Sequence, residues 1–239
     1  MPKYYKISEA AEFLGVSVQT LRRWAKGFLV PDFVSPGGHR YYSQQQLEHF
    51  LSPLIQLARS WVSPEKPADL AKDDYCENSA VFQARLNRFS MELQRKKIPI
   101  ETVALVGIVV GEIGNNSFDH NIGNWPDMPG VFFGYDAERR CLVLADRGQG
   151  VLKTLKRVRP NLETESDAVR TAFTESVSGR APEKRGNGLK TVRIVVSEHP
   201  FALSFQSGDA IFSMGARDKE LIIKQTSEVI HGTLAILNF

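Results

Sequence analysis

The chain has 239 residues, of which 42% are hydrophobic and 24% charged, a composition ordinary for a globular protein with one large domain or two smaller ones. The net charge of +3 permits an acidic partner without requiring one, and the two cysteines, Cys76 and Cys141, match no disulfide or metal-binding spacing. The N-terminal segment lacks the apolar stretch of a signal peptide and no apolar run could span a bilayer, so we expect a cytoplasmic protein without a membrane segment.

The first fifty residues predict a small helical module with a hairpin. YKISEAAEFLG predicts a helix with Ser8 as N-cap, ended by Gly15, and SVQTLRRWAKG predicts a second helix capped by Ser17 and closed by Gly27. VSPGGHRYY predicts a β-hairpin around its two glycines. A third helix is expected to begin at Ser43, with Gln46 completing a capping box, and Ser52 is placed to cap a further turn over 53–61.

A helix, a short glycine turn and a second helix have the spacing of a DNA-reading motif. We expect the second helix to expose its polar side chains and the hairpin to clamp the DNA backbone. The candidate DNA-binding residues are Gln19, Thr20, Arg22, Arg23, His39 and Arg40.

The stretch AAEFLGVSVQTLRRWAKGFL…PGGHRYYS resembles the MerR-type and excisionase-type winged helix-turn-helix, and also the N-terminal segment of certain serine recombinases of transposons. The resemblance covers residues 5–50 and implies that Arg22, Arg23, His39 and Arg40 face double-stranded DNA. Because one such module binds weakly, we expect a homodimer on a two-part site. The alternative is a small helical protein-interaction domain whose arginines are merely solvated.

The rest of the chain predicts an α+β domain, with helices on one face of a mixed sheet. The segment 60–79 carries two prolines and many charges, which indicates a linker. Beyond it we expect helices over 79–97 and 100–121, a strand pair over 131–136 and 140–146, two further helices, a loop over 174–188, another helix and four strands. We therefore divide the chain into a DNA-binding domain (1–52), a helical linker (53–80) and a second domain (81–239).

The stretch GEIGNNSFDH, residues 111–120, places polar groups at the end of an apolar helix. Glu112 and Asn116 are four residues apart and share one helical face, and Asp119 and His120 follow on the next turn. A carboxylate there can accept a proton from an attacking water or hydroxyl. An amide oxygen is a hard ligand that suits Mg²⁺.

Two glycine motifs downstream suit a nucleotide. LVLADRGQGV places Asp146 at the end of an apolar strand, where it can accept a hydrogen bond from the amine of adenine. RGNGLKTVRIV places glycines before a helix whose N-terminal amides suit phosphate, and the preceding loop is basic. The candidate nucleotide-binding residues are Asn116, Asp119, Asp146, Gly148, Gly150, Lys184, Arg185, Gly186, Gly188 and Leu189.

Each motif is weak alone, but their order resembles the GHKL superfamily, the ATPases of gyrase, the heat-shock chaperone, histidine kinases and MutL. The resemblance runs from about residue 82 to 239 and implies a Bergerat-type α/β sandwich that binds ATP with Mg²⁺. It implies Glu112 as general base, Asn116 as metal ligand, Asp146 on adenine and residues 151–187 as an ATP lid. HGTLAILNF resembles the closing strand of that fold.

The sequence leaves three functions open. These are a DNA-binding regulator whose nucleotide state modulates its binding to DNA or a partner, a serine/threonine protein kinase with a protein partner as substrate, and a non-catalytic ATP sensor. The run ExxxNxxxH also resembles the anti-sigma serine/threonine kinases, although His120 is equally well explained as a hydrogen-bonding residue of the helix cluster. No phosphoacceptor histidine lies between residues 50 and 119, and we interpret His49 as structural.

Overall fold

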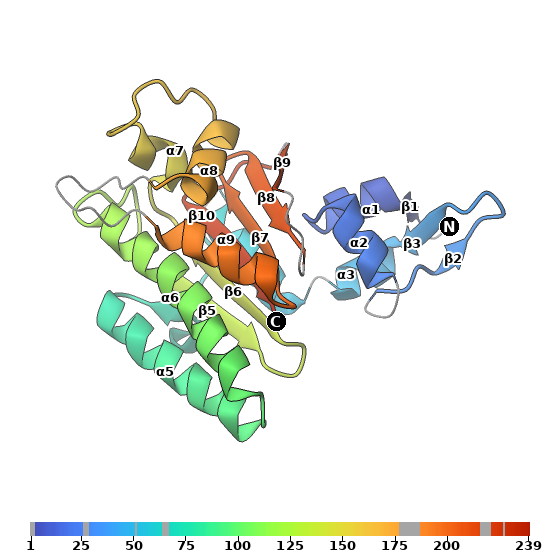
Figure 1. Ribbon diagram of the computed structural model, residues 1–239, viewed down its shortest axis with the longest axis horizontal. Helices are drawn as coiled ribbons and strands as arrows, with labels where there is room; N and C mark the ends of the chain where they lie inside the picture. Colours follow the sequence, from blue (N-terminus) through green and yellow to red (C-terminus); the bar gives the residue numbers. More distant parts are fainter. Residues whose placement is uncertain are drawn as a thin grey trace.

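The computed structural model describes residues 3–25, 29–50, 52–63, 67–176, 187–215, 221–226 and 228–239. A small N-terminal module lies beside a larger unit built on one sheet (Figure 1). The α+β class predicted from the sequence is confirmed.

The N-terminal module is a three-stranded sheet in the order β1-β3-β2, with three short helices. Its elements are β1 (Tyr4–Lys6), α1 (Ile7–Phe13), α2 (Val18–Trp24), β2 (Phe33–Val34), β3 (Arg40–Ser43) and α3 (Gln44–Phe50). The predicted hairpin is confirmed, because β2 and β3 pair antiparallel. A core of its own holds the module together: Ala10, Ala11, Leu14, Leu21, Leu29, Tyr42 and Leu47 are buried.

Capping explains where these helices begin. Ser17 caps α2 as predicted, since its Oγ accepts a hydrogen bond from the Thr20 amide at 2.9 Å. The prediction of Ser8 as a cap is wrong: the unpredicted strand β1 runs to Lys6, whose amide donates to Glu9 Oε2 at 2.7 Å. Gln46 does not complete a capping box either, because the Ser43 amide donates to Asp32 Oδ2 instead, at 2.6 Å. The predicted closing residue of α2, Gly27, lies outside the described residues.

The larger unit is a seven-stranded sheet in the order β4-β5-β6-β10-β7-β8-β9. All its described strand pairs are antiparallel, so the expectation of a mixed sheet is wrong. The strands are β4 (Tyr75–Cys76), β5 (Val131–Asp136), β6 (Cys141–Asp146), β7 (Ala202–Ser207), β8 (Ala210–Met214), β9 (Ile222–Gln225) and β10 (Thr233–Asn238). The last strand in sequence, β10, lies between β6 and β7 near the middle of the sheet.

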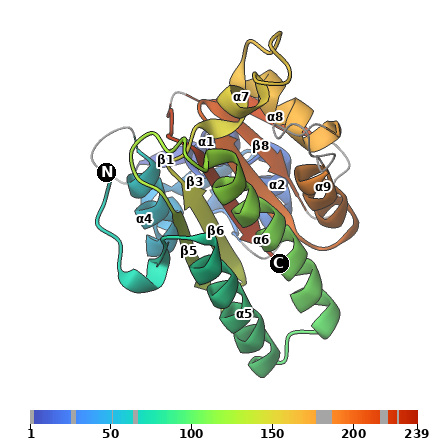
Figure 2. The same cartoon turned by 90° about the vertical axis from the view of Figure 1, so that its left-hand side faces the viewer.

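Helices cover both faces of this sheet, not one face as predicted (Figures 1 and 2). On one face lie α5 (Ser79–Arg95), α6 (Ile100–Asn121) and α9 (Gly188–Glu198), with α7 (Gly150–Leu155) and α8 (Glu165–Thr174) at one end. On the other face α4 (Pro53–Val62) packs against β5, β6 and β10. The expected linker 53–80 thus supplies α4 and the edge strand β4 to the larger unit.

Strand β6 explains why both faces must be covered. All six of its residues are buried. Leu142 and Leu144 join the core under α5 and α6, whereas Cys141, Val143 and Ala145 join the core under α4. Successive side chains of a strand point to opposite faces, so a continuous apolar strand requires a packing layer on each side.

Candidate functional site

A cavity of ≈ 460 Å³ lies where α6, α7 and α9 meet the end of β6. This volume lies within the roughly 300–1,000 Å³ typical of small-molecule sites. The cavity brings together segments that are far apart in sequence. Its walls include seven of the predicted site residues: Glu112, Asn116, Asp119, Asp146, Gly150, Gly188 and Leu189.

The polar end of α6 forms one wall. Glu112, Asn116, Asp119 and His120 all line the cavity and are half-buried. The opposite face of the same helix is apolar and packs into the core through Val106, Val109, Val110 and Ile113. These polar groups, which would be unfavourable in the apolar core, therefore line a cavity instead.

The N-terminus of α9 lies against this wall. A Cβ added to Gly188, the first residue of α9, would lie 2.5 Å from Glu112 Oε2 and 3.3 Å from Asn116 Nδ2. An added methyl group would require the Glu112 carboxylate to shift, so glycine leaves this corner of the cavity open. The first amides of a helix have no intrahelical partner and carry its positive dipole end, so this corner of the cavity suits an anionic group.

Asp146 lies at the inner end of the cavity and is 1% exposed. Its Oδ2 accepts hydrogen bonds from Ser117 Oγ at 2.8 Å and Thr233 Oγ1 at 2.5 Å, and its Oδ1 accepts one from the Gly148 amide at 2.8 Å. Burial raises the pKa of Asp146, and these hydrogen bonds offset part of that rise. The carboxyl is thus held in one orientation by α6, β10 and the turn after β6.

The two glycines of the DxGxG motif have different structural roles. Gly150 is the first residue of α7 and has a φ of +74°, a backbone conformation that favours glycine. It lines the cavity as predicted. Gly148 is not among the lining residues; a Cβ there would meet Asn121 Nδ2 at 2.1 Å. Gly148 therefore serves the packing of the turn against α6. Lys184, Arg185 and Gly186, together with Arg180, lie outside the described residues.

Sequence reasoning missed several residues that support Asp146. Ser117 follows Glu112 on α6, and Thr233 begins β10 directly opposite Asp146. Gly232 precedes it with a φ of +64°, and a Cβ there would lie 2.1 Å from the Asp146 carbonyl oxygen. In the sequence these residues appear as an HGT run at the start of the last strand and a serine within the polar turn. Neither pattern indicates a contact with Asp146, because that contact depends on the order of the strands in the sheet.

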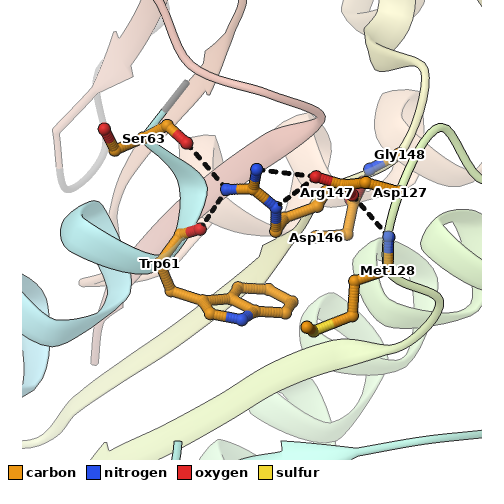
Figure 3. Close-up of polar contacts among 7 residues, drawn as sticks. All are labelled: Trp61, Ser63, Asp127, Met128, Asp146, Arg147 and Gly148. Atoms are coloured by element: carbon orange, nitrogen blue, oxygen red, sulfur yellow. Dashed lines mark hydrogen bonds and ion pairs between the residues drawn. The ribbon is translucent and has the colours of Figure 1, made fainter. Parts of the chain in front are cut away.

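Arg147 is the other residue that sequence reasoning missed (Figure 3). It is only 2% exposed and follows Asp146 directly. Its guanidinium donates to Asp127 Oδ2 from Nε at 2.8 Å and from Nη2 at 2.6 Å, and its Nη1 donates to the carbonyls of Trp61 and Ser63. Burial raises the pKa of Asp127, but the hydrogen bonds and charge of Arg147, together with the Met128 amide and the His231 charge, leave that pKa below its usual range.

Arg147 therefore connects three segments. It joins the turn after Asp146 to the C-terminal end of α4 and to the loop that follows α6 (Figure 3). A cation beside the last carbonyls of a helix is also favoured by the helix dipole. Through α4, the end of the cavity is linked to the segment that leads from the N-terminal module.

In the N-terminal module, α2 presents a narrower polar face than predicted. Gln19 and Arg22 are exposed, but Thr20 is 3% exposed and its hydroxyl is hydrogen-bonded to Ser17 Oγ at 2.8 Å. The expectation that Thr20 is exposed is wrong, because its side chain belongs to the N-terminal cap of α2. Arg23 is half-buried, and its guanidinium fills the space beside Gly215, where a Cβ would lie 2.0 Å from Nη2.

The hairpin between β2 and β3 projects away from the large sheet (Figure 1). Its turn is closed by hydrogen bonds from the Ser35 amide to the His39 carbonyl and from the Gly38 amide to the Ser35 carbonyl, both 2.8 Å. Gly38 has a φ of +77°, which its turn position requires. His39 at this tip is exposed and Arg40 is half-buried.

Comparison with known families identifies this module. Residues 5–52 match the family described as MerR HTH family regulatory protein. Residues 5–52 form a MerR-type helix-turn-helix domain. A domain of this type suggests a DNA-binding regulator. The match therefore supports DNA binding by this domain, without identifying the residues that contact DNA. No curated protein matches the chain.

Two absences within the described residues bear on the site. No helix there has the length and apolar character needed to cross a membrane. No group of three or more His, Cys, Asp or Glu side chains in those ranges could hold a metal ion by itself. A cation beside Glu112 and Asn116 would therefore take its remaining ligands from water or from a bound ligand.

Proposed function

We propose that the chain is a DNA-binding regulator whose larger domain binds ATP together with Mg²⁺ in the cavity beside α6. The observation that carries this proposal is the convergence of three motifs on one cavity: the α6 face with Glu112 and Asn116, Asp146 at the end of β6, and the N-terminus of α9 at Gly188. We assign ATP binding to residues 81–239, with α4 and β4 packed onto that domain.

The side chains and backbone amides that line the cavity suit both ends of the nucleotide. The Asp146 carboxyl is an acceptor at the buried end of the cavity and suits the exocyclic amine of adenine. At the other end, the amides of α9 suit phosphate oxygens, and the Asn116 amide oxygen suits Mg²⁺. Bound there, ATP with Mg²⁺ would supply a transferable phosphoryl group whose charge the metal offsets.

In the hydrolytic form of this proposal, Glu112 is the catalytic residue. Its carboxylate lines the cavity next to the N-terminus of α9, so it can accept a proton from a water that attacks the terminal phosphorus. Asn116, one turn along the same helix, would hold the metal, and the missing side chain of Gly188 leaves space beside both residues. That Glu112 and Asn116 lie on the same helix supports this assignment, because a rigid element holds a base and a metal ligand at a fixed spacing.

A titration of the purified chain with ATP, with and without Mg²⁺, tests the proposal by isothermal calorimetry. We expect one site per chain and a loss of affinity of about tenfold or more in Asp146→Asn, from the loss of one buried acceptor. Asp136→Asn is the control, because Asp136 lies at the far end of the same strand pair and pairs with Arg139. No saturable binding to the wild-type chain, or equal affinity in Asp146→Asn, would contradict ATP binding at this cavity.

A protein serine/threonine kinase is the second candidate function, favoured by the position of His120 in the same cavity wall. In that case a hydroxyl of a protein partner attacks the terminal phosphorus, and ADP leaves. Incubation with γ-labelled ATP separates the two functions: the ATPase releases label as inorganic phosphate, whereas the kinase transfers it to the partner protein.

A further inference from the structure

Helix α4 contacts both the N-terminal module and the segments that build the cavity beside α6. It begins at Pro53, directly after the MerR-type domain ends at residue 52. It runs for ten residues to Val62, a length of about 15 Å. Ser52 caps its first turn, since the Ser52 Oγ accepts a hydrogen bond from the Ile55 amide. Figure 2 shows α4 on the face of the sheet opposite α5 and α6.

The C-terminal end of α4 is held by the segments that also hold Asp146. The carbonyls of residues 61–63 all accept hydrogen bonds from them: Arg147 Nη1 donates to the first and, at 2.7 Å, to the third (Figure 3). The His231 amide donates to the second at 2.9 Å. Arg147 follows Asp146 in the chain, and His231 lies two residues before Thr233, which donates to the Asp146 carboxyl. Carbonyls at the end of a helix have no partner within the helix, so these bonds fix α4 to the end of the cavity.

The middle of α4 contacts the turn of the helix-turn-helix. A Cβ added to Gly15, between α1 and α2, would lie 2.6 Å from Arg59 Nη2. The Arg59 guanidinium is held by an ion pair with Glu228 at 2.9 Å, and the Arg59 side chain is only 16% exposed. On its other side, the Gly15 carbonyl accepts a hydrogen bond from Ser204 Oγ of β7 at 3.0 Å. The turn that joins α1 to α2 therefore packs on both α4 and the sheet.

We propose that α4 transmits the nucleotide state of the cavity beside α6 to the DNA-binding domain, with Arg147 and Arg59 as the positioning residues at its two contacts. This inference rests on the proposed binding of ATP in that cavity. A nucleotide that pairs with Asp146 acts on the turn that carries Arg147. Because α4 is capped at its first turn and held at its last carbonyls, it is expected to shift as one body, by about 1–2 Å. ATP changes DNA affinity by this route only if it binds the two positions of α4 with different affinity.

The test compares DNA affinity with and without ATP and Mg²⁺, in the wild-type chain and in Arg59→Met. The probe is a duplex of about 30 base pairs, selected by the wild-type chain from a random-sequence pool and long enough for two half-sites. We expect the two affinities of the wild-type chain to differ by about fivefold or more. In Arg59→Met this ratio should fall close to one. ATP affinity, by calorimetry, should stay within about twofold, because Arg59 is not among the residues that line the cavity.

Two substitutions serve as matched controls. Arg59→Lys keeps a cation that can pair with Glu228, so we expect it to retain most of the ratio. Arg159→Met removes an ion pair of similar kind, with Glu175 at 3.1 Å, but neither residue belongs to α4 or lines the cavity. It should leave the ratio unchanged. A loss of stability alone does not change the ratio, because both affinities are measured on the folded chain.

Arg147→Met tests the contact at the end of the cavity and should also bring the ratio close to one. If it does not fold, as judged by circular dichroism, Arg59→Met decides the matter. A wild-type chain that binds ATP with a ratio of one would overturn this inference and leave the proposed ATP binding in place, whereas the absence of ATP binding would overturn both. An unchanged ratio in Arg59→Met would overturn the role of α4.

Discussion

At the residue scale, the most buried polar group of the cavity beside α6, the Asp146 carboxyl, is held by neighbours from other elements. Asp146 on β6 is oriented by Ser117 on α6 and Thr233 on β10, and Gly188 on α9 lies against Glu112. Such cross-element support is what holds a site near its working geometry. The chemistry proposed for each residue can therefore be tested one side chain at a time.

Glu112→Gln separates the ATPase from the non-catalytic sensor. Glutamine keeps the size of the side chain but cannot accept the proton of an attacking water. We expect ATP hydrolysis, measured as phosphate release, to fall on the order of 10²–10⁴-fold, while ATP affinity by calorimetry changes little. Phosphate release by Glu112→Gln at the wild-type rate would show that Glu112 is not the general base. The sensor hypothesis instead requires that neither the wild-type chain nor the variant releases phosphate while both bind ATP.

At the element scale, α6 is the part of the fold on which most of the cavity depends. It packs on α5 through Gly114, where a Cβ would lie 2.1 Å from the Phe82 ring, and it carries the polar wall one turn away. Gly107 lies on the same helix, yet a Cβ there would meet nothing within 4 Å. Two glycines of one helix thus have opposite physical roles.

The two glycines give a matched pair of substitutions. Gly114→Ala should lower the free energy of unfolding by about 1–3 kcal/mol, because the added methyl forces Phe82 to move in a packed core. Gly107→Ala should raise it by about 0.5–1 kcal/mol, since alanine loses less backbone entropy in a helix. Urea denaturation measures both, and a Gly114→Ala chain as stable as the wild type would contradict the α5–α6 packing.

Arg147 connects the turn after β6 to the end of α4 and to the loop after α6. The substitution Arg147→Met tests how much this connection stabilises the fold. Methionine leaves the carbonyls of Trp61 and Ser63 without their buried donor. We expect a loss of about 1–3 kcal/mol in the free energy of unfolding, by urea denaturation. Arg139→Met, at a half-exposed arginine, is the control and should change stability by less than about 0.5 kcal/mol.

At the scale of the whole molecule, α2, the second helix of the helix-turn-helix domain, lies next to the large sheet. Arg23 fills the space beside Gly215, and Thr20 and Trp24 line a cavity whose other walls include Leu203 and Ile236 of the sheet. A movement of this part of the larger domain would therefore act directly on residues that contact α2. ATP can shift DNA affinity only if it binds two arrangements of the domains with different affinity, and the coupling is then reciprocal.

Arg22→Ala should weaken DNA binding more than Arg23→Ala, because Arg22 is exposed on α2 whereas Arg23 is half-buried against the sheet. Affinity of the wild-type chain should fall as salt rises, since phosphate neutralisation releases counterions. A DNA-shift assay at two salt concentrations, with and without ATP and Mg²⁺, measures both effects. Affinity independent of salt would contradict DNA contact, and affinity independent of ATP would contradict coupling.

Much of the fold could be read from local patterns. The bounds of α6 over 100–121 and the strand pair β5–β6 follow from apolar periodicity and a turn, which are local properties of the chain. The layer formed by α4 was not recognised, although the continuous apolar run of β6 indicated a second covered face. The antiparallel order of the central strands could not be predicted, because strand pairing depends on contacts between distant segments.

The sequence by itself determined the chemistry of the parts: a MerR-type helix-turn-helix over 5–52, an acid and an amide four residues apart on one helix, and an aspartate after an apolar strand. Only the tertiary structure decided that Ser117 and Thr233 hold Asp146, that Arg147 joins it to α4, and that Thr20 is buried. The physical reason is that side-chain type is local, whereas burial and hydrogen-bond partners depend on which distant elements pack together.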